Sequence, residues 1–154
     1  MNRATFYAHF QDKDDLLEHC LREKCRAVLS AALPEGRQET PAAWCHLIQA
    51  VLDFFARMPR QCPQAARQWN GIVVNAMREE LEALLEDWLA EARPAHAGRQ
   101  MVIATVSGAI VTAGMRWLRG KAGVTTEEGA AELTAFVTVG LLSRDRPGLA
   151  DGQA

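Results

Sequence analysis

The chain has 154 residues, of which 49% are hydrophobic and 23% are charged. This mixture is typical of one globular domain with its own core, and it excludes a collagenous or intrinsically disordered chain. Seventeen basic and nineteen acidic residues give a formal charge of −2, without the basic excess that is typical of nucleic-acid-binding proteins. Composition alone therefore argues against DNA binding.

The cysteines and the N-terminal residues indicate the cellular compartment. The four cysteines have none of the spacings of a zinc finger, ribbon or knuckle, and a chain of this length needs no disulfides for stability. Residues 1–10 contain no apolar run after basic residues, so no secretory signal is expected. The uncharged stretch 100–115 is shorter than the ~20 residues that span a bilayer. We therefore expect reduced thiols, a cytoplasmic location and no membrane partner.

Apolar residues recur at helical spacing nearly throughout the chain, which predicts an all-α fold. The expected helices cover approximately residues 12–32, 40–58, 62–69, 73–92, 97–120 and 125–141. Thr40 before Pro41 is a helix start signal, and Thr125 with Glu128 predicts a capping box. Pro59 is expected to end the second helix. The expected apolar face of this helix consists of Trp44, Leu47, Ile48, Val51, Phe54, Phe55 and Met58.

Gly71 is expected to separate the short third helix, 62–69, from the helix that follows it. That next helix is amphipathic. Its acidic side is expected to be solvated and contains Glu79, Glu80, Glu82, Glu86 and Glu91.

Helix 97–120 is apolar on all sides, so all of its surface must be covered. A second subunit covers such a helix more easily than one small domain does. We therefore predict a homodimer through the last two long helices; the alternative is a monomer whose earlier helices cover this surface. The expected interface residues are Val106, Ile110, Ala113, Trp117, Leu133, Phe136, Val137 and Leu141.

The opening residues carry the most specific functional signal. Phe6 and Phe10 are four apart and share one face of a short helix, while polar side chains point elsewhere. Guanidinium, hydroxyl, phenol and imidazole groups on one turn suit the phosphates and base edges of DNA. Lys13, in the first turn of the next helix, adds a cation beside backbone amides that also attract anions. The polar side chains of the short helix are Arg3, Thr5, Tyr7 and His9.

These residues resemble a known family. The run NRATFYAHF at 2–10, followed by DKDDLL at 12–17, is similar to the recognition helix and the next helix start of the tetracycline-repressor (TetR) family of bacterial transcriptional regulators. The rest of the chain resembles, more loosely, the helical ligand-binding and dimerisation domain of that family. The resemblance implies a partial helix-turn-helix at 1–11, the ligand-binding and dimerisation domain at 12–143 and a disordered tail at 144–154.

The resemblance also implies roles for individual residues. Asn2, Arg3 and Thr5 would approach base edges or phosphates in the major groove. Tyr7 and His9 would touch the sugar-phosphate backbone. A further phosphate contact would come from Lys13. The implied partner is operator DNA.

A helix-turn-helix needs a first helix packed against the reading helix, and this sequence begins inside the second. We expect Met1 to be a valine start codon misread as the beginning of a longer protein, which an in-frame stop directly upstream would contradict. If Met1 is the true start, the chain is a sensing and dimerising domain with little or no DNA binding.

The function that the resemblance implies is transcriptional regulation, by default repression that a small apolar ligand relieves. Large side chains on successive helices are candidate walls of its pocket, although each is also a normal core residue. Asp53, His46 and Arg116 are candidate polar anchors. The candidate wall residues are Phe55, Met58, Trp69, Met77, Trp88 and Trp117.

No motif predicts catalysis, since the sequence has no glycine-rich phosphate loop after a strand and no nucleophile elbow. We assign no catalytic residue, metal or cofactor. A metal or thiol redox sensor is the rival hypothesis, because His19-Cys20 and Cys25 share one helix and Cys45-His46 lie on the next. However, Cys20 and Cys25 point roughly 140° apart, so a common site needs a ligand from another helix.

Overall fold

The computed structural model describes residues 13–33, 36, 38–61, 70–92 and 98–142. Its helices are α2 (Lys13–Ala32), α3 (Pro41–Gln61), α5 (Asn70–Ala92), α6 (Arg99–Leu118) and α7 (Thr126–Leu142). The described ranges contain no strand, which confirms the all-α prediction. The predicted short helix at 62–69 and the predicted tail lie outside these ranges.

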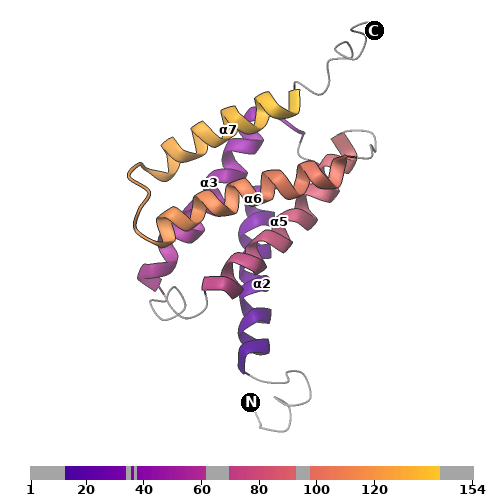
Figure 1. Cartoon of the computed structure of the whole chain (residues 1–154). Coiled ribbons are helices and arrows are strands. Elements are labelled where there is room, and N and C mark those ends of the chain that lie inside the picture. The colour runs from indigo at the N-terminus through magenta and orange to yellow at the C-terminus, as the bar shows by residue number, and fades with distance from the viewer. Residues whose placement is uncertain (1–12, 34–35, 37, 62–69, 93–97, 143–154) are drawn as a thin grey trace, which may run out of the picture.

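Helix α3 is the centre of the fold. It packs against α2, α6 and α7, and α5 packs against α2 and α6 (Figure 1). The apolar face predicted for α3 is buried throughout. The buried residues of that face are Trp44, Leu47, Ile48, Val51, Phe54, Phe55 and Met58.

Both predicted cap signals are present. The side-chain oxygen of Thr40 accepts a hydrogen bond from the Ala43 N–H at 3.1 Å, and Pro41 is the first residue of α3. The Glu128 N–H donates to Thr125 Oγ1 at 3.2 Å, and the Thr125 N–H donates to Glu128 Oε2 at 2.9 Å. This reciprocal pair is the predicted capping box at the start of α7.

Two predicted boundaries are wrong. Pro59 lies inside α3, which continues to Gln61. Pro59 cannot donate the hydrogen bond that an N–H at this position would make to the carbonyl of Phe55, four residues earlier, and α3 continues for only two residues beyond it. Gly71 is the second residue of α5 and does not interrupt it. In the first turn, N–H groups have no intrahelical partner in any case.

Two glycines allow helices to approach aromatic rings closely. A Cβ atom on Gly114 of α6 would lie 2.8 Å from Cε2 of Phe55 in α3. A Cβ atom on Gly129 of α7 would lie 3.0 Å from Cζ2 of Trp117 and 3.3 Å from Cδ1 of Leu52. The packing at both positions therefore requires a residue without a side chain.

Helix α6 is buried on only one side. Its buried residues include Ile103, Ile110 and Val111, whereas Met101 is 73% exposed. Within the described ranges, α6 is the one helix long and apolar enough to cross a membrane, a property shared by core helices of soluble proteins. Only 33% of its most apolar window is buried. A single chain thus leaves much of this apolar helix uncovered.

Candidate functional site

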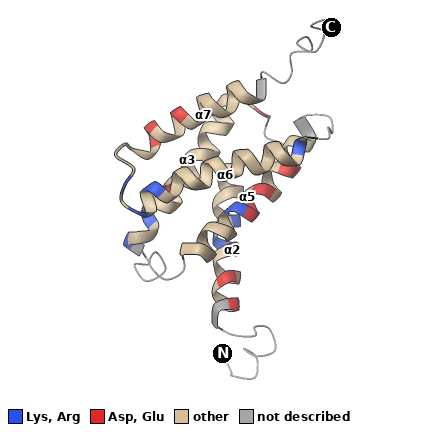
Figure 2. Cartoon of the chain, viewed as in Figure 1, with Lys and Arg blue, Asp and Glu red and all other residues tan. Residues whose placement is uncertain are grey.

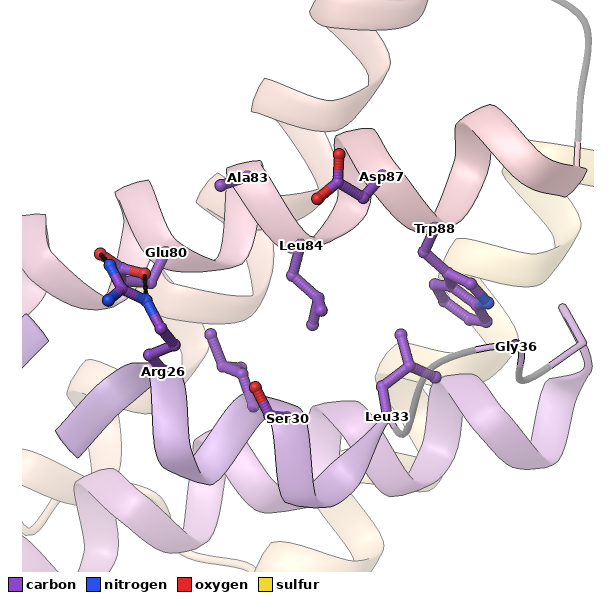
Figure 3. A pocket seen from close by; sticks show the side chains of 10 residues that line it. Arg26, Ser30, Leu33, Gly36, Glu80, Ala83, Leu84, Asp87 and Trp88 are labelled. Atoms are coloured by element: carbon purple, nitrogen blue, oxygen red, sulfur yellow. Dashed lines mark hydrogen bonds and ion pairs between the residues drawn. The ribbon is translucent and has the colours of Figure 1, made fainter. Parts of the chain in front are cut away.

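A cleft of about 440 Å³ lies between α2 and α5 (Figure 3). This volume falls in the range of roughly 300–1,000 Å³ that is typical of small-molecule sites. Leu29 of α2, Leu33 directly after this helix, and Leu84 of α5 give it an apolar middle. The other lining residues are Arg26, Ser30, Gly36, Glu80, Ala83, Asp87 and Trp88.

Trp88 forms one end of this cleft. Its ring extends from α5 toward α2 (Figure 3) and is 6% exposed. Its ring centroid lies 4.8 Å from that of Trp44 in α3, with the planes tilted by 54°. The Trp44 Nε1–H donates to Glu39 Oε1 at 3.3 Å. Trp88 therefore connects the cleft directly to the buried core.

An ion pair between α2 and α5 forms the other end. Arg26 Nε donates to Glu80 Oε2 at 3.0 Å and Nη2 donates to Oε1 at 3.1 Å, while Nη1 donates to Glu23 at 2.7 Å. The hydrogen bonds and charge of Glu80, with the charge of Glu23, raise the pKa of the Arg26 guanidinium. The Glu80 side chain is only 10% exposed, so this end of the cleft is closed by a fixed charge pair.

Arg22, one turn earlier, extends this network. It donates to Glu18 at 3.0 Å and to Glu79, and it lies 3.7 Å from Glu80. The hydrogen bonds that Arg22 donates to Glu18 and Glu79 raise the pKa of its guanidinium. Figure 2 shows these charged residues gathered on α2 and α5, while the middle of α6 carries none.

The acidic side predicted for α5 is therefore not simply solvated. That prediction is wrong for Glu80, which pairs with α2, and for Glu82, whose Oε1 accepts a hydrogen bond from Ser107 Oγ at 3.0 Å. For Glu80, the physical reason is that two arginines on successive turns of α2 face α5. For Glu82, it is that α6 packs against α5. The spacing of four residues between Arg22 and Arg26 indicates that both lie on one face of α2. The sequence does not specify that α5 is the helix that packs against this face.

The predicted pocket walls occupy different environments. Trp88 lines the cleft, and Trp117 is partly buried against the core. Trp69 lies outside the described residues. Three others are buried in the core: Phe55, Met58 and Met77. Sequence reasoning missed the leucines of the cleft and Asp87, because they form a wall only once α2 and α5 are neighbours.

The candidate polar anchors lie elsewhere. His46 and Asp53 line a shallow groove of about 430 Å³ between α2 and α3. Arg116, near the end of α6, donates from Nη2 to the Lys121 carbonyl at 3.1 Å. None of the three lines the α2–α5 cleft.

The predicted dimer residues differ in their exposure within the single chain. Ile110 and Val137 are buried within the chain. Phe136 is 70% exposed, and Leu141 belongs to α7 although its side chain is not described. The partly buried members are Val106, Ala113, Trp117 and Leu133. Two further large apolar side chains are exposed on the same helices, Met101 at 73% and Val139 at 65%.

The predicted DNA-binding residues Asn2, Arg3, Thr5, Tyr7 and His9 lie outside the described residues. Lys13 is the first residue of α2, at the position where the sequence places the start of the helix after the short DNA-facing segment. The roles of these residues in DNA binding remain predictions.

The described cysteines, Cys20, Cys25 and Cys45, differ in burial. Burial raises the pKa of the Cys25 thiol to about 12, which disfavours the thiolate that acts as a nucleophile or a metal ligand. Cys20 is exposed and Cys45 is partly buried. In the part of the chain that the structure describes, no three His, Cys, Asp or Glu side chains gather as metal ligands.

Comparisons of the chain with models of protein families, with curated proteins and with solved structures gave no match. The described fold defines an all-α protein with a cleft of small-molecule size. The TetR resemblance rests on the opening residues and on the helical pattern of the chain.

Proposed function

We propose that this protein is a TetR-like transcriptional regulator, and specifically a repressor that a small, largely apolar molecule releases from DNA. The observation that carries the proposal is the segment NRATFYAHF at 2–10 with DKDDLL at 12–17. Two features support it. Helix α2 starts at Lys13, directly after that segment, and the helical body contains a cleft large enough for a small ligand.

Helix α2 connects the cleft with the proposed DNA-facing segment, so ligand binding could affect that segment through this helix. The C-terminal half of α2 forms one wall of the cleft, and its N-terminal end adjoins the segment. A molecule that binds one arrangement of α2 and α5 better than another shifts the population toward that arrangement. Ligand affinity and DNA affinity are then coupled through α2.

The proposal includes a homodimer formed through α6 and α7. Monomeric proteins expose scattered apolar residues, but contiguous apolar surface on long helices usually marks an interface. Met101 of α6 and Phe136 and Val139 of α7 are each more than half exposed in the single chain. A second copy packed on these helices would cover them and the open side of α6.

The experiment for DNA binding uses a C-terminally tagged chromosomal copy, so that the cell itself sets the N-terminus. We expect chromatin immunoprecipitation to enrich a palindromic site near the gene for this protein. Arg3→Ala should lower the enrichment about tenfold, because one base-reading arginine contributes on the order of 1–3 kcal/mol.

Arg119→Ala is the matched control, since Arg119 is exposed at the end of α6 and should leave the enrichment unchanged. Absence of any enriched site, or equal enrichment for both variants, would contradict the proposal. A dimer that binds small molecules without enriching DNA would instead indicate the sensing and dimerising protein.

A further inference from the structure

We infer that the α2–α5 cleft binds an amphipathic organic cation, with an ammonium head at the Asp87–Trp88 end and an aliphatic body over the leucines. This inference deepens the proposed function by naming the chemical class of the effector, and it rests on that function for its regulatory meaning. It is carried by the charge, the aromatic end and the length of the cleft.

The charge balance of the lining favours a cation. Its charged residues are Arg26, Glu80 and Asp87, which sum to one negative charge. The positive charge of Arg26 is already balanced, because its guanidinium donates to two carboxylates. The wider network adds further negative charge, since Arg22 and Arg26 together face four glutamates. The net negative charge in and beside the lining therefore favours a cationic ligand over an anionic one.

Asp87 is the carboxylate that is free to take part. In the described ranges it makes no hydrogen bond and no ion pair, whereas Glu80 is held by Arg26. It lies at the rim of the cleft, on the residue directly before Trp88 (Figure 3). The negative charge of this carboxylate attracts an alkylammonium group at the mouth of the cleft, whereas the Trp88 ring contributes apolar and aromatic surface to the end wall.

The middle of the cleft requires an apolar body of defined length. Leu29, Leu33 and Leu84 offer neither a donor nor an acceptor from their side chains. From Glu80 to Asp87 the wall of α5 spans seven residues, or ~10 Å at the helical rise. This is about the length of an extended octyl chain. A small inorganic cation would leave the apolar middle unfilled.

The test compares three probes with the same octyl chain on the full-length protein: octyltrimethylammonium, octanol and octanoate. Calorimetric titration below the micellar concentration gives the dissociation constants, and tryptophan fluorescence reports on Trp88. We expect the ammonium to bind at least about fivefold more tightly than octanol, and octanoate to bind most weakly. Trp88→Phe should remove most of the fluorescence change. Equal affinities for the three probes, or no binding of the ammonium, would overturn the inference.

Two variants of one helix locate the head group. Asp87→Asn should weaken ammonium binding about threefold and leave octanol unchanged, because it removes the charge and keeps the shape. Glu86→Gln is the matched control, since it removes the same charge from the adjacent exposed residue outside the cleft lining. Both side chains are exposed, so the melting temperatures of the free proteins should not change. Identical effects of the two substitutions would overturn the placement of the head group.

A charge reversal at Asp87 should reverse the order of affinities for the cationic and anionic probes, a result that damage to the fold would not produce. Asp87→Lys should invert the preference, so that octanoate binds more tightly than octyltrimethylammonium. These titrations contain no DNA. Failure of the cation to bind therefore leaves the proposed regulator intact, whereas cation binding without an enriched chromosomal site refutes the regulator and leaves the cleft inference standing.

Discussion

Single residues set how closely the helices pack. Gly114 is buried where α6 crosses Phe55, which is itself fully buried and has no room to withdraw. Gly108, on the same helix, has no atom within 4 Å of the position its Cβ atom would take. The two glycines therefore have opposite roles, although both looked alike in the sequence as small residues in an apolar helix.

This contrast predicts opposite effects of one substitution. Gly114→Ala should lower the free energy of unfolding by about 1–3 kcal/mol, because overpacking outweighs the gain of ~1 kcal/mol in helix propensity. Gly108→Ala should raise it by up to ~1 kcal/mol. Urea denaturation measures both values. Stabilisation by both substitutions would show that Phe55 can move aside.

At the scale of the helices, the sequence predicted local features well. The caps at Thr40 and Thr125 and the buried face of α3 depend on neighbouring residues in the chain, and all are confirmed. The ion pairs between α2 and α5 join residues more than 50 positions apart, so no local pattern could specify them. The same limit applies to the cleft. Of its lining, only Trp88 was among the predicted pocket walls.

The charged contact between α2 and α5 should be sensitive to salt. Glu80→Gln removes the carboxylate that contacts both Arg22 and Arg26, and we expect it to lower the melting temperature by a few degrees. Added sodium chloride should destabilise the native protein more than this variant, because screening acts only where the charges remain.

Glu86→Gln again serves as the control, since Glu86 is exposed on the same helix. A melting temperature that is equal for the two variants, with the same dependence on salt, would mean that the network does not hold the two helices together.

At the scale of the whole molecule, the fold has an internal core and an open side. The core is built around α3, whereas the apolar surface of α6 and α7 is incompletely covered. The sequence predicted that α6 needs cover on all sides, and the single chain supplies it on one. The packing of α3 and α5 against α6 determines which face of α6 stays open. The sequence could not predict this face, because α6 is apolar on all sides.

The proposed homodimer would cover this open side of α6 and α7, and its interface can be tested by mutation. Sedimentation velocity at micromolar concentration should show a dimer, and Phe136→Glu should raise the dissociation constant about 30-fold or more, because it buries a charge in the interface. Val124→Glu places the same charge on another exposed apolar residue, between α6 and α7, and should have little effect. A native protein that sediments at 17.0 kDa would contradict the dimer.

The N-terminal end of α2 projects from the fold, far from the part of the same helix that lines the cleft. Leu21 is the first of its described side chains to be buried, and Leu17, one turn earlier, packs only partly against the core, so the N-terminal end of α2 projects beyond the other helices (Figure 1). Lys13 lies 16 residues before Leu29, or ~24 Å along the helix axis. A tilt of about 10° with its fulcrum at the cleft would displace Lys13 by roughly 4 Å. In the proposed regulator, that displacement would exceed the ~3.4 Å spacing of base pairs along DNA, so a small tilt of α2 around a bound molecule would move its far end by about one base-pair step.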